Sequence, residues 1–275
     1  MKKIIILIFS VAAILYADIK IAVSILPQEF FVKKIAGDLA DVEVMVKPGA
    51  SPATYSVKPS QLKALKDTKV YFAIGVPFEK AWLERFQSVN PSLKIVDSGK
   101  YIKRVPMQDE EEKHTGLDPH IWLSPPLVIL QARAIAETLS KIDPANASKY
   151  IKNYQKFVSQ TASLDAELLE KSKDIKQKEF IVFHPSFGYF ARAYGLKQIA
   201  IEKEGKEPTL KYIQKIIEFA KKRGIKKVFV EPQFSHKSAK YIAKQIKGEV
   251  IIVDPLAYDW DKNIKRIAKA FENSY

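Results

Sequence analysis

The segment that most constrains the fold runs from Ala145 to Ile175, because it contains neither glycine nor proline. Apolar side chains recur along it at helical spacing, at Tyr150, Tyr154, Phe157, Leu164 and Leu168. A helix of this length would reach about 45 Å, which is longer than one lobe of a chain of this size requires. The segment therefore predicts a single long helix that serves as a rigid spine between two lobes.

Short apolar runs alternate with helical patterns on both sides of this segment, which is typical of parallel sheets with crossover helices. The runs that predict strands are 19–26, 42–46, 70–74, 93–96, 180–183, 196–201, 228–230 and 250–253. The helical patterns fall at 59–65, 78–87, 125–139, 186–194, 208–222, 237–246 and 264–271, and a further helix ends near Gly37. The pattern predicts an α/β fold of two Rossmann-like lobes joined by one long backbone helix. We expect the N-terminal lobe at 18–142, the linking helix at 143–177 and the C-terminal lobe at 178–275.

The first seventeen residues resemble a secretory signal peptide. Lys2 and Lys3 precede an apolar run over 4–15, and Ala17 stands before polar sequence. The run is too short to span a bilayer comfortably, and no stop-transfer pattern follows it, which disfavours the alternative of a membrane anchor. The chain has no cysteine that could carry a lipid. We therefore predict a cleaved signal at 1–17 and release into the periplasm, not a lipoprotein.

The formal net charge of +14 raises the question of a nucleic-acid partner. The lysines, however, are spread over predicted helix faces, and Lys221, Lys222 and Arg223 gather at a helix end, where they complement the helix dipole. We interpret the charge as a solvated basic surface and expect no nucleic-acid partner. Weak attraction to anionic membranes stays open.

Candidate metal ligands follow predicted strands or precede predicted helices. His120 lies in the motif Asp-Pro-His-Ile-Trp-Leu-Ser-Pro (118–125), His184 follows the strand at 180–183, and Asp254 follows the strand at 250–253. In open α/β sheets, ligands bind beyond the carboxyl ends of the strands. Because the chain lacks cysteine, a metal must use imidazole or carboxylate ligands, which suit Zn²⁺. Each residue alone could equally serve in capping or packing, so spacing does not by itself define a site.

Four segments in this order carry a resemblance that covers nearly all of the mature chain. They are Gly49-Ala50-Ser51-Pro52 with Tyr55 and Pro59-Ser60-Gln61, then the 118–125 motif, then Glu207-Pro208 with Glu231-Pro232-Gln233, and finally Asp254-Pro255-Leu256. In these segments the chain resembles the zinc-uptake members of the cluster A-I metal-binding proteins of bacterial ABC transporters.

The resemblance implies a non-enzymatic carrier that holds a metal ion in the cleft between its lobes and delivers it to a membrane permease. It implies His120, His184 and Asp254 as ligands. Zinc is favoured over manganese, because manganese-type relatives generally carry glutamate where this chain has His184, and because nitrogen ligands favour zinc. Ligation needs neutral imidazoles, so we expect the affinity to fall as the pH drops through the histidine range near 6.5. A monomer is the expected state.

This chain departs from the family pattern at Ala53, where the family has a histidine ligand. Alanine cannot coordinate a metal. A water molecule could complete the coordination, or His236 could join the site. His114, in the polar stretch 97–117 that we expect to be a flexible loop, is the other candidate.

Two other functions stay open at this stage. Three protein ligands and a water also describe catalytic zinc, so a metal-dependent hydrolase with Glu29 or Glu231 as base is one alternative, although no His-Glu-x-x-His motif is present. The other is a family member that has lost metal binding and acts in adhesion or binds another solute.

Overall fold

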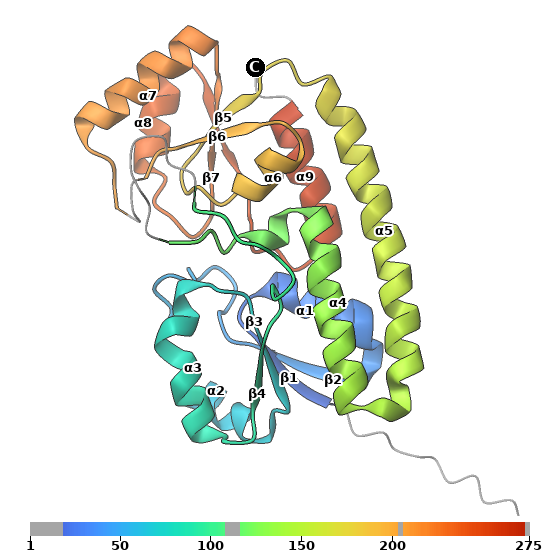
Figure 1. The fold of residues 1–275 in the computed structure, drawn as a ribbon. Coiled ribbons are helices and arrows are strands. Elements are labelled where there is room, and N and C mark those ends of the chain that lie inside the picture. The colour runs from blue at the N-terminus through green and yellow to red at the C-terminus, as the bar shows by residue number, and fades with distance from the viewer. Residues whose placement is uncertain (1–18, 108–115, 203–205, 273–275) are drawn as a thin grey trace, which may run out of the picture.

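The computed structural model describes residues 19–107, 116–202 and 206–272. The predicted signal peptide at 1–17, as well as His114 with the neighbouring acidic residues 109–112, lies outside the described residues. Helix α5 (Ala147–Lys173) runs along one side of the molecule and passes both sheets (Figure 1). Its 27 residues span about 40 Å. The predicted long helix is thereby confirmed.

Each lobe is built on a parallel sheet of four strands with the same order. The first sheet has the order β2-β1-β3-β4, and the second has the order β6-β5-β7-β8. The strands are β1 (Ile19–Val23), β2 (Ala40–Val44), β3 (Val70–Ala73), β4 (Lys94–Asp97), β5 (Glu179–Val182), β6 (Lys197–Ala200), β7 (Lys227–Val230) and β8 (Glu249–Ile252). Every strand predicted from the sequence is present, and the predicted α/β fold is confirmed.

Helices cover both faces of each sheet. In the upper lobe of Figure 1, α7 and α8 lie on one face of the sheet, whereas α6 and α9 lie on the other. The remaining bounds are α1 (Leu26–Ala36), α2 (Pro59–Ala64), α3 (Pro77–Val89), α4 (Pro125–Ile142), α6 (Gly188–Ala193), α7 (Leu210–Arg223), α8 (Lys237–Gln245) and α9 (Trp260–Glu272). The strand predicted over 19–26 ends at Val23, because Leu26 and Pro27 already begin α1. Proline is well suited to this first helical turn, where its missing N–H would have no partner.

A single apolar cluster extends from the first sheet across α4, α5 and α9 into the second lobe. Trp260, the first residue of α9, packs its ring against Phe31 of α1 at 5.4 Å between centroids and against Phe157 of α5 at 6.3 Å. At the other end of α9, Phe271 stacks on Phe180 of β5 at 4.2 Å. The two lobes therefore share one core. A second, smaller cluster lies under α7 and α8.

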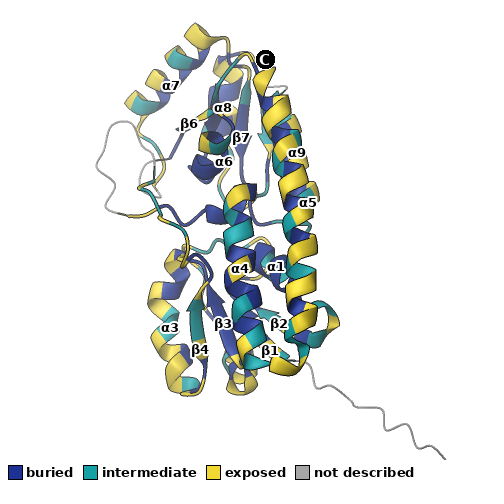
Figure 2. Ribbon diagram, turned by 45° about the vertical axis from the view of Figure 1, so that its right-hand side comes forward, coloured by how far each residue is buried: buried dark blue, intermediate teal, exposed yellow. Residues whose placement is uncertain are grey.

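The exposed residues lie mainly on the outward faces of helices, which is clear for α3, α5 and α7 in Figure 2. Among the described residues, no helix has both the length and the apolar character that crossing a bilayer requires.

Candidate metal centre

His120 is held in a short buried turn that leads into the 3-10 turn Ile121–Leu123 and then α4. Its ring Nδ1 donates to Asp118 Oδ1 at 2.7 Å, and its backbone N–H donates to the same oxygen at 2.9 Å. The Asp118 carboxylate therefore fixes both the turn and the orientation of the ring. A neutral imidazole with its proton on Nδ1 has the lone pair of Nε2 free for a metal ion.

His184 stands two residues beyond the end of β5. Its Nδ1 donates to Glu202 Oε1 at 2.7 Å, and Glu202 is itself buried two residues beyond the neighbouring strand β6. The ring of Phe234 stacks on the imidazole, with 4.9 Å between centroids and 25° between planes. A carboxylate that accepts from the remote nitrogen of an imidazole is the usual support of a metal-binding histidine.

The two imidazoles meet through their Nε2 atoms, with 3.3 Å between His120 Nε2 and His184 Nε2. Because both Nδ1 atoms are engaged by carboxylates, both Nε2 atoms face the same small volume and would offer their lone pairs to one ion when the rings are neutral. A tetrahedral zinc ion with Zn–N bonds of about 2.0–2.1 Å holds two nitrogens about 3.3–3.4 Å apart. The separation in this structure therefore matches two nitrogens that share one tetrahedral ion.

Glu231 lies directly beyond β7, beneath His184. Its carboxylate accepts from the backbone N–H of His184 at 3.2 Å and from Ser186 Oγ at 3.0 Å. Complete burial raises the pKa of Glu231 to about 7, and the nearby His184 and these hydrogen bonds offset only part of that effect. Glu231 thus supports the backbone of the segment that carries His184.

The third predicted ligand, Asp254, stands two residues beyond β8 on the same edge of the sheet. Its Oδ1 accepts from Gln233 Nε2 at 3.0 Å and from the backbone N–H of Leu256 at 2.9 Å. Within the described ranges, no group of three or more histidine, aspartate or glutamate side chains forms a ready-made metal site. The structure brings together His120 and His184, and Asp254 as a ligand stays a prediction.

Two other positions considered from the sequence make local hydrogen bonds of their own. Ala53 is exposed in a turn, and its N–H donates to Ser51 Oγ at 3.2 Å. His236 stands at the start of α8, where its carbonyl accepts from the N–H of Lys240.

In the first lobe, a buried hydrogen-bond network lies beyond the carboxyl ends of β1 and β3. Ser24, directly beyond β1, contacts the buried Tyr71 at 2.7 Å between hydroxyl oxygens and donates to Glu79. Glu79 also accepts from the backbone N–H groups of Ile74 and Gly75, both at 2.8 Å. Burial raises the pKa of Glu79, and these hydrogen bonds partly offset it. This network is internally satisfied, so it serves to hold the first lobe's loops.

Sequence reasoning missed the role of Glu202 and of the Asp118 side chain. Glu202 follows the strand predicted at 196–201, so the rule that placed His184 at a strand's carboxyl end could also have found Glu202. Nothing in the spacing of Asp118 and His120 indicates that the carboxylate folds back onto the ring. That contact depends on the turn conformation.

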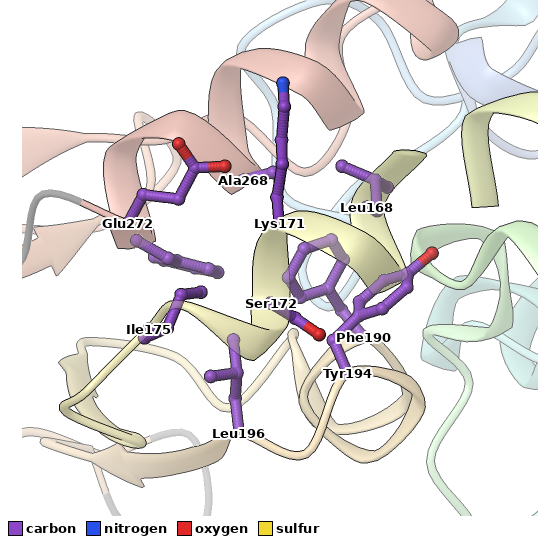
Figure 3. A pocket seen from close by; sticks show the side chains of 10 residues that line it. Leu168, Lys171, Ser172, Ile175, Phe190, Tyr194, Leu196, Ala268 and Glu272 are labelled. Atoms are coloured by element: carbon purple, nitrogen blue, oxygen red, sulfur yellow. The ribbon is translucent and has the colours of Figure 1, made fainter. Parts of the chain in front are cut away.

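A small hollow lies at the C-terminal end of α5, where Figure 3 shows side chains of α5, α6 and α9 around it. Apolar groups such as Leu168, Phe190 and Leu196 line it, and it leaves room for about one water molecule. Its lining offers no histidine, so it is a packing defect and not a second metal site.

Two parallel sheets of identical strand order, one long connecting helix and a histidine pair between the lobes define a two-lobed solute-binding protein for a metal ion. Residues 21–273 match the family described as "Zinc-uptake complex component A periplasmic". The chain belongs to this family.

Solved structures and a curated relative agree with this assignment. The "Crystal structure of ZnuA" is 42% identical with a TM-score of 0.90, and the match covers 94% of this chain and 99% of that one. A "138-173 ZnuA deletion mutant plus zinc bound" is also 42% identical, with a TM-score of 0.89 over 94% and 98% of the two chains. A "Putative metal-binding protein" of Chlamydia trachomatis is 29% identical over 92% of this chain and 91% of its own length.

Family membership makes the chain a zinc-uptake solute-binding protein of an ABC transporter. It is a transport component and not an enzyme, which confirms that prediction and removes the hydrolase alternative. The family is periplasmic, and the partners that it implies are the metal ion and the transporter.

Proposed function

We propose that this chain captures one Zn²⁺ ion in the periplasm through His120 and His184 and delivers it to the membrane permease of its transporter. The observation that carries the proposal is the 3.3 Å separation of the two Nε2 atoms, each on a ring whose Nδ1 is held by a buried carboxylate. Imidazole donors favour zinc over manganese, which prefers oxygen ligands.

Asp254 is the third ligand in this proposal, and a water molecule takes the position that Ala53 cannot fill. Both hydrogen bonds that the structure gives the Asp254 carboxylate go to Oδ1. A ligand role through Oδ2 would therefore leave these bonds in place. Three protein ligands and a water satisfy tetrahedral zinc.

The carrier acts as a monomer of two lobes, 18–142 and 178–275, linked by 143–177. A signal at 1–17 is removed on export, the mature chain is not a lipoprotein because it has no cysteine to carry a lipid, and its basic surface has no nucleic-acid partner. Capture requires affinity without reaction, and the ion must leave at the permease.

Calorimetric titration of the chelator-stripped mature protein with Zn²⁺ and, separately, Mn²⁺ tests the proposal. We expect one tight zinc site and much weaker manganese binding. His120→Ala and His184→Ala should each abolish the site, and Asp254→Asn should weaken it. His236→Ala is the matched control and should bind like the parent. If neither metal gives a saturable site, Ala53 marks a lost function and the capture proposal is wrong.

A further inference from the structure

The Asp118 carboxylate that orients His120 lies close against helix α6 of the second lobe. Gly188 is the first residue of α6, and its surroundings leave no room for a side chain at this position. A Cβ at Gly188 would lie 2.8 Å from Asp118 Oδ2 and 3.2 Å from Gln198 Nε2. The absent side chain thus lets the helix backbone come close to the carboxylate.

Tyr189, the next residue, links the main chain at Asp118 to the main chain at Val105. Its hydroxyl donates to the carbonyl oxygen of Asp118 at 3.2 Å and accepts from the backbone N–H of Val105 at 3.0 Å. The Asp118 N–H in turn donates to the Val105 carbonyl at 2.8 Å. Its phenol oxygen therefore ties together the two chain segments that hold the His120 turn.

The segment between His184 and Gly188 is rigid enough to serve as a support. Gln198 of β6 accepts from the N–H of Phe187 at 2.9 Å and donates to the carbonyl of Pro185 at 3.1 Å. Ser186 donates to the buried Glu231 at 3.0 Å. His184 and the support for Asp118 therefore belong to one short, internally fixed stretch of chain.

We propose that Gly188 and Tyr189 are positioning residues for zinc, which act through Asp118 to keep the His120 imidazole at bonding distance from the ion that His184 holds. The inference rests on the proposed function and adds to it the residues that set the nitrogen–nitrogen separation. Neither residue touches the metal. Both act on the support of a ligand, where substitutions typically cost 10- to 100-fold in metal affinity.

The test measures Zn²⁺ affinity by competition with a chromophoric chelator for the parent, Tyr189→Phe and Gly188→Ala. Tyr189→Phe removes one oxygen and leaves the ring, and we expect affinity to fall roughly 10-fold. Gly188→Ala displaces the Asp118 carboxylate and should cost at least as much. The visible spectrum of the Co²⁺-loaded protein should change in both variants, because the geometry around the ion changes.

Tyr194→Phe is the matched control, because Tyr194 directly follows α6 and its hydroxyl donates to Asp165 of α5 at 2.8 Å, away from His120. It loses a comparable hydrogen bond, so its zinc affinity and Co²⁺ spectrum should equal those of the parent. Parent-like affinity in both Tyr189→Phe and Gly188→Ala would overturn the positioning role alone. An equal loss in Tyr194→Phe would also overturn it, because the effect would then be general destabilisation. A parent that binds no zinc would overturn the proposed function, and the positioning role with it.

Discussion

At the scale of single residues, the site depends on two carboxylates that bind the Nδ1 atoms of the imidazoles, on the side of each ring away from the paired Nε2 atoms. Asp118 and Glu202 each accept from an Nδ1 at 2.7 Å and are almost completely buried. Burial makes these charge-assisted hydrogen bonds strong and keeps water from competing for them. Each ring is thereby held in one orientation before any ion arrives, which reduces the cost of ordering the ligands on binding.

Glu231 makes the stability of the metal-free protein depend on pH. Its pKa is raised from 4.5 to about 7 by burial, so the folded state binds the proton more tightly than the unfolded state does. The resulting stability is fully present below pH 4.5 and is lost as the pH rises through 7. The loss amounts to at most about 3 kcal/mol. Glu231→Gln removes this titration, so its unfolding free energy should change less than that of the parent between pH 5 and pH 8.

Urea denaturation of chelator-stripped protein at pH 5, 6.5 and 8 measures the difference. Glu207→Gln is the control, because Glu207 is exposed and accepts only from Ser238 among the hydrogen bonds that the structure gives it. Its pH profile should follow that of the parent. A Glu231→Gln profile parallel to the parent's would show that burial does not perturb this carboxyl.

Residue types and their places beside predicted strands and helices made His120 and His184 candidates, because both features are local, but only the family resemblance implied them as ligands. The rule that ligands bind beyond the carboxyl ends of strands could also have indicated Glu202, as well as Glu231 in a supporting role. It could not reach Gly188 or Tyr189, because their contacts join segments about 70 residues apart. Such contacts depend on how the loops pack, which hydrophobic periodicity does not encode.

At the scale of elements, the long helix was the feature most easily predicted, because its apolar stripe and lack of helix breakers are strong local signals. The bounds predicted for the shorter helices were less accurate. The pattern at 186–194 becomes α6 only from Gly188, because hydrogen bonds to Gln198 and Glu231 hold residues 185–187 in a turn. Helix α7 begins at Leu210 and not at Pro208, since the Thr209 side chain accepts from the N–H of Tyr212 and caps the helix.

The apolar stripe of α5 predicts that substitutions of two adjacent leucines will differ sharply in their effect on the free energy of unfolding. Leu168 is 2% exposed and packs into the shared core, whereas Leu169 is 50% exposed. Leu168→Ala should lower the free energy of unfolding by about 2–5 kcal/mol, through lost burial and the cavity left behind. Leu169→Ala should change it by less than about 1 kcal/mol. Urea denaturation measures both, and equal effects would mean that α5 does not anchor the core through this face.

At the scale of the whole molecule, the two sheets share a core, and the histidine pair lies where the lobes meet. One apolar cluster includes residues of β1, α4, α5 and α9 together with Phe180 of β5. The Trp122 indole donates to the carbonyl of Pro255 at 2.8 Å, and the Trp260 indole donates to the carbonyl of Trp122 at 2.6 Å. These bonds tie the turn that carries His120 to the C-terminal segment. The lobes should therefore unfold together, although each has a complete sheet.

Zinc should accordingly shift one cooperative thermal transition of the entire chain. At a free concentration of 100 times its dissociation constant, the ion adds about 2.7 kcal/mol to the stability of the folded state. For a chain of this size that corresponds to a rise of roughly 5–10 °C in the midpoint. Differential scanning calorimetry with and without Zn²⁺ measures it, and His120→Ala should show no zinc-dependent shift. Two separate transitions, of which zinc moves only one, would contradict a shared core, because the ion would then stabilise a lobe that unfolds independently of the other.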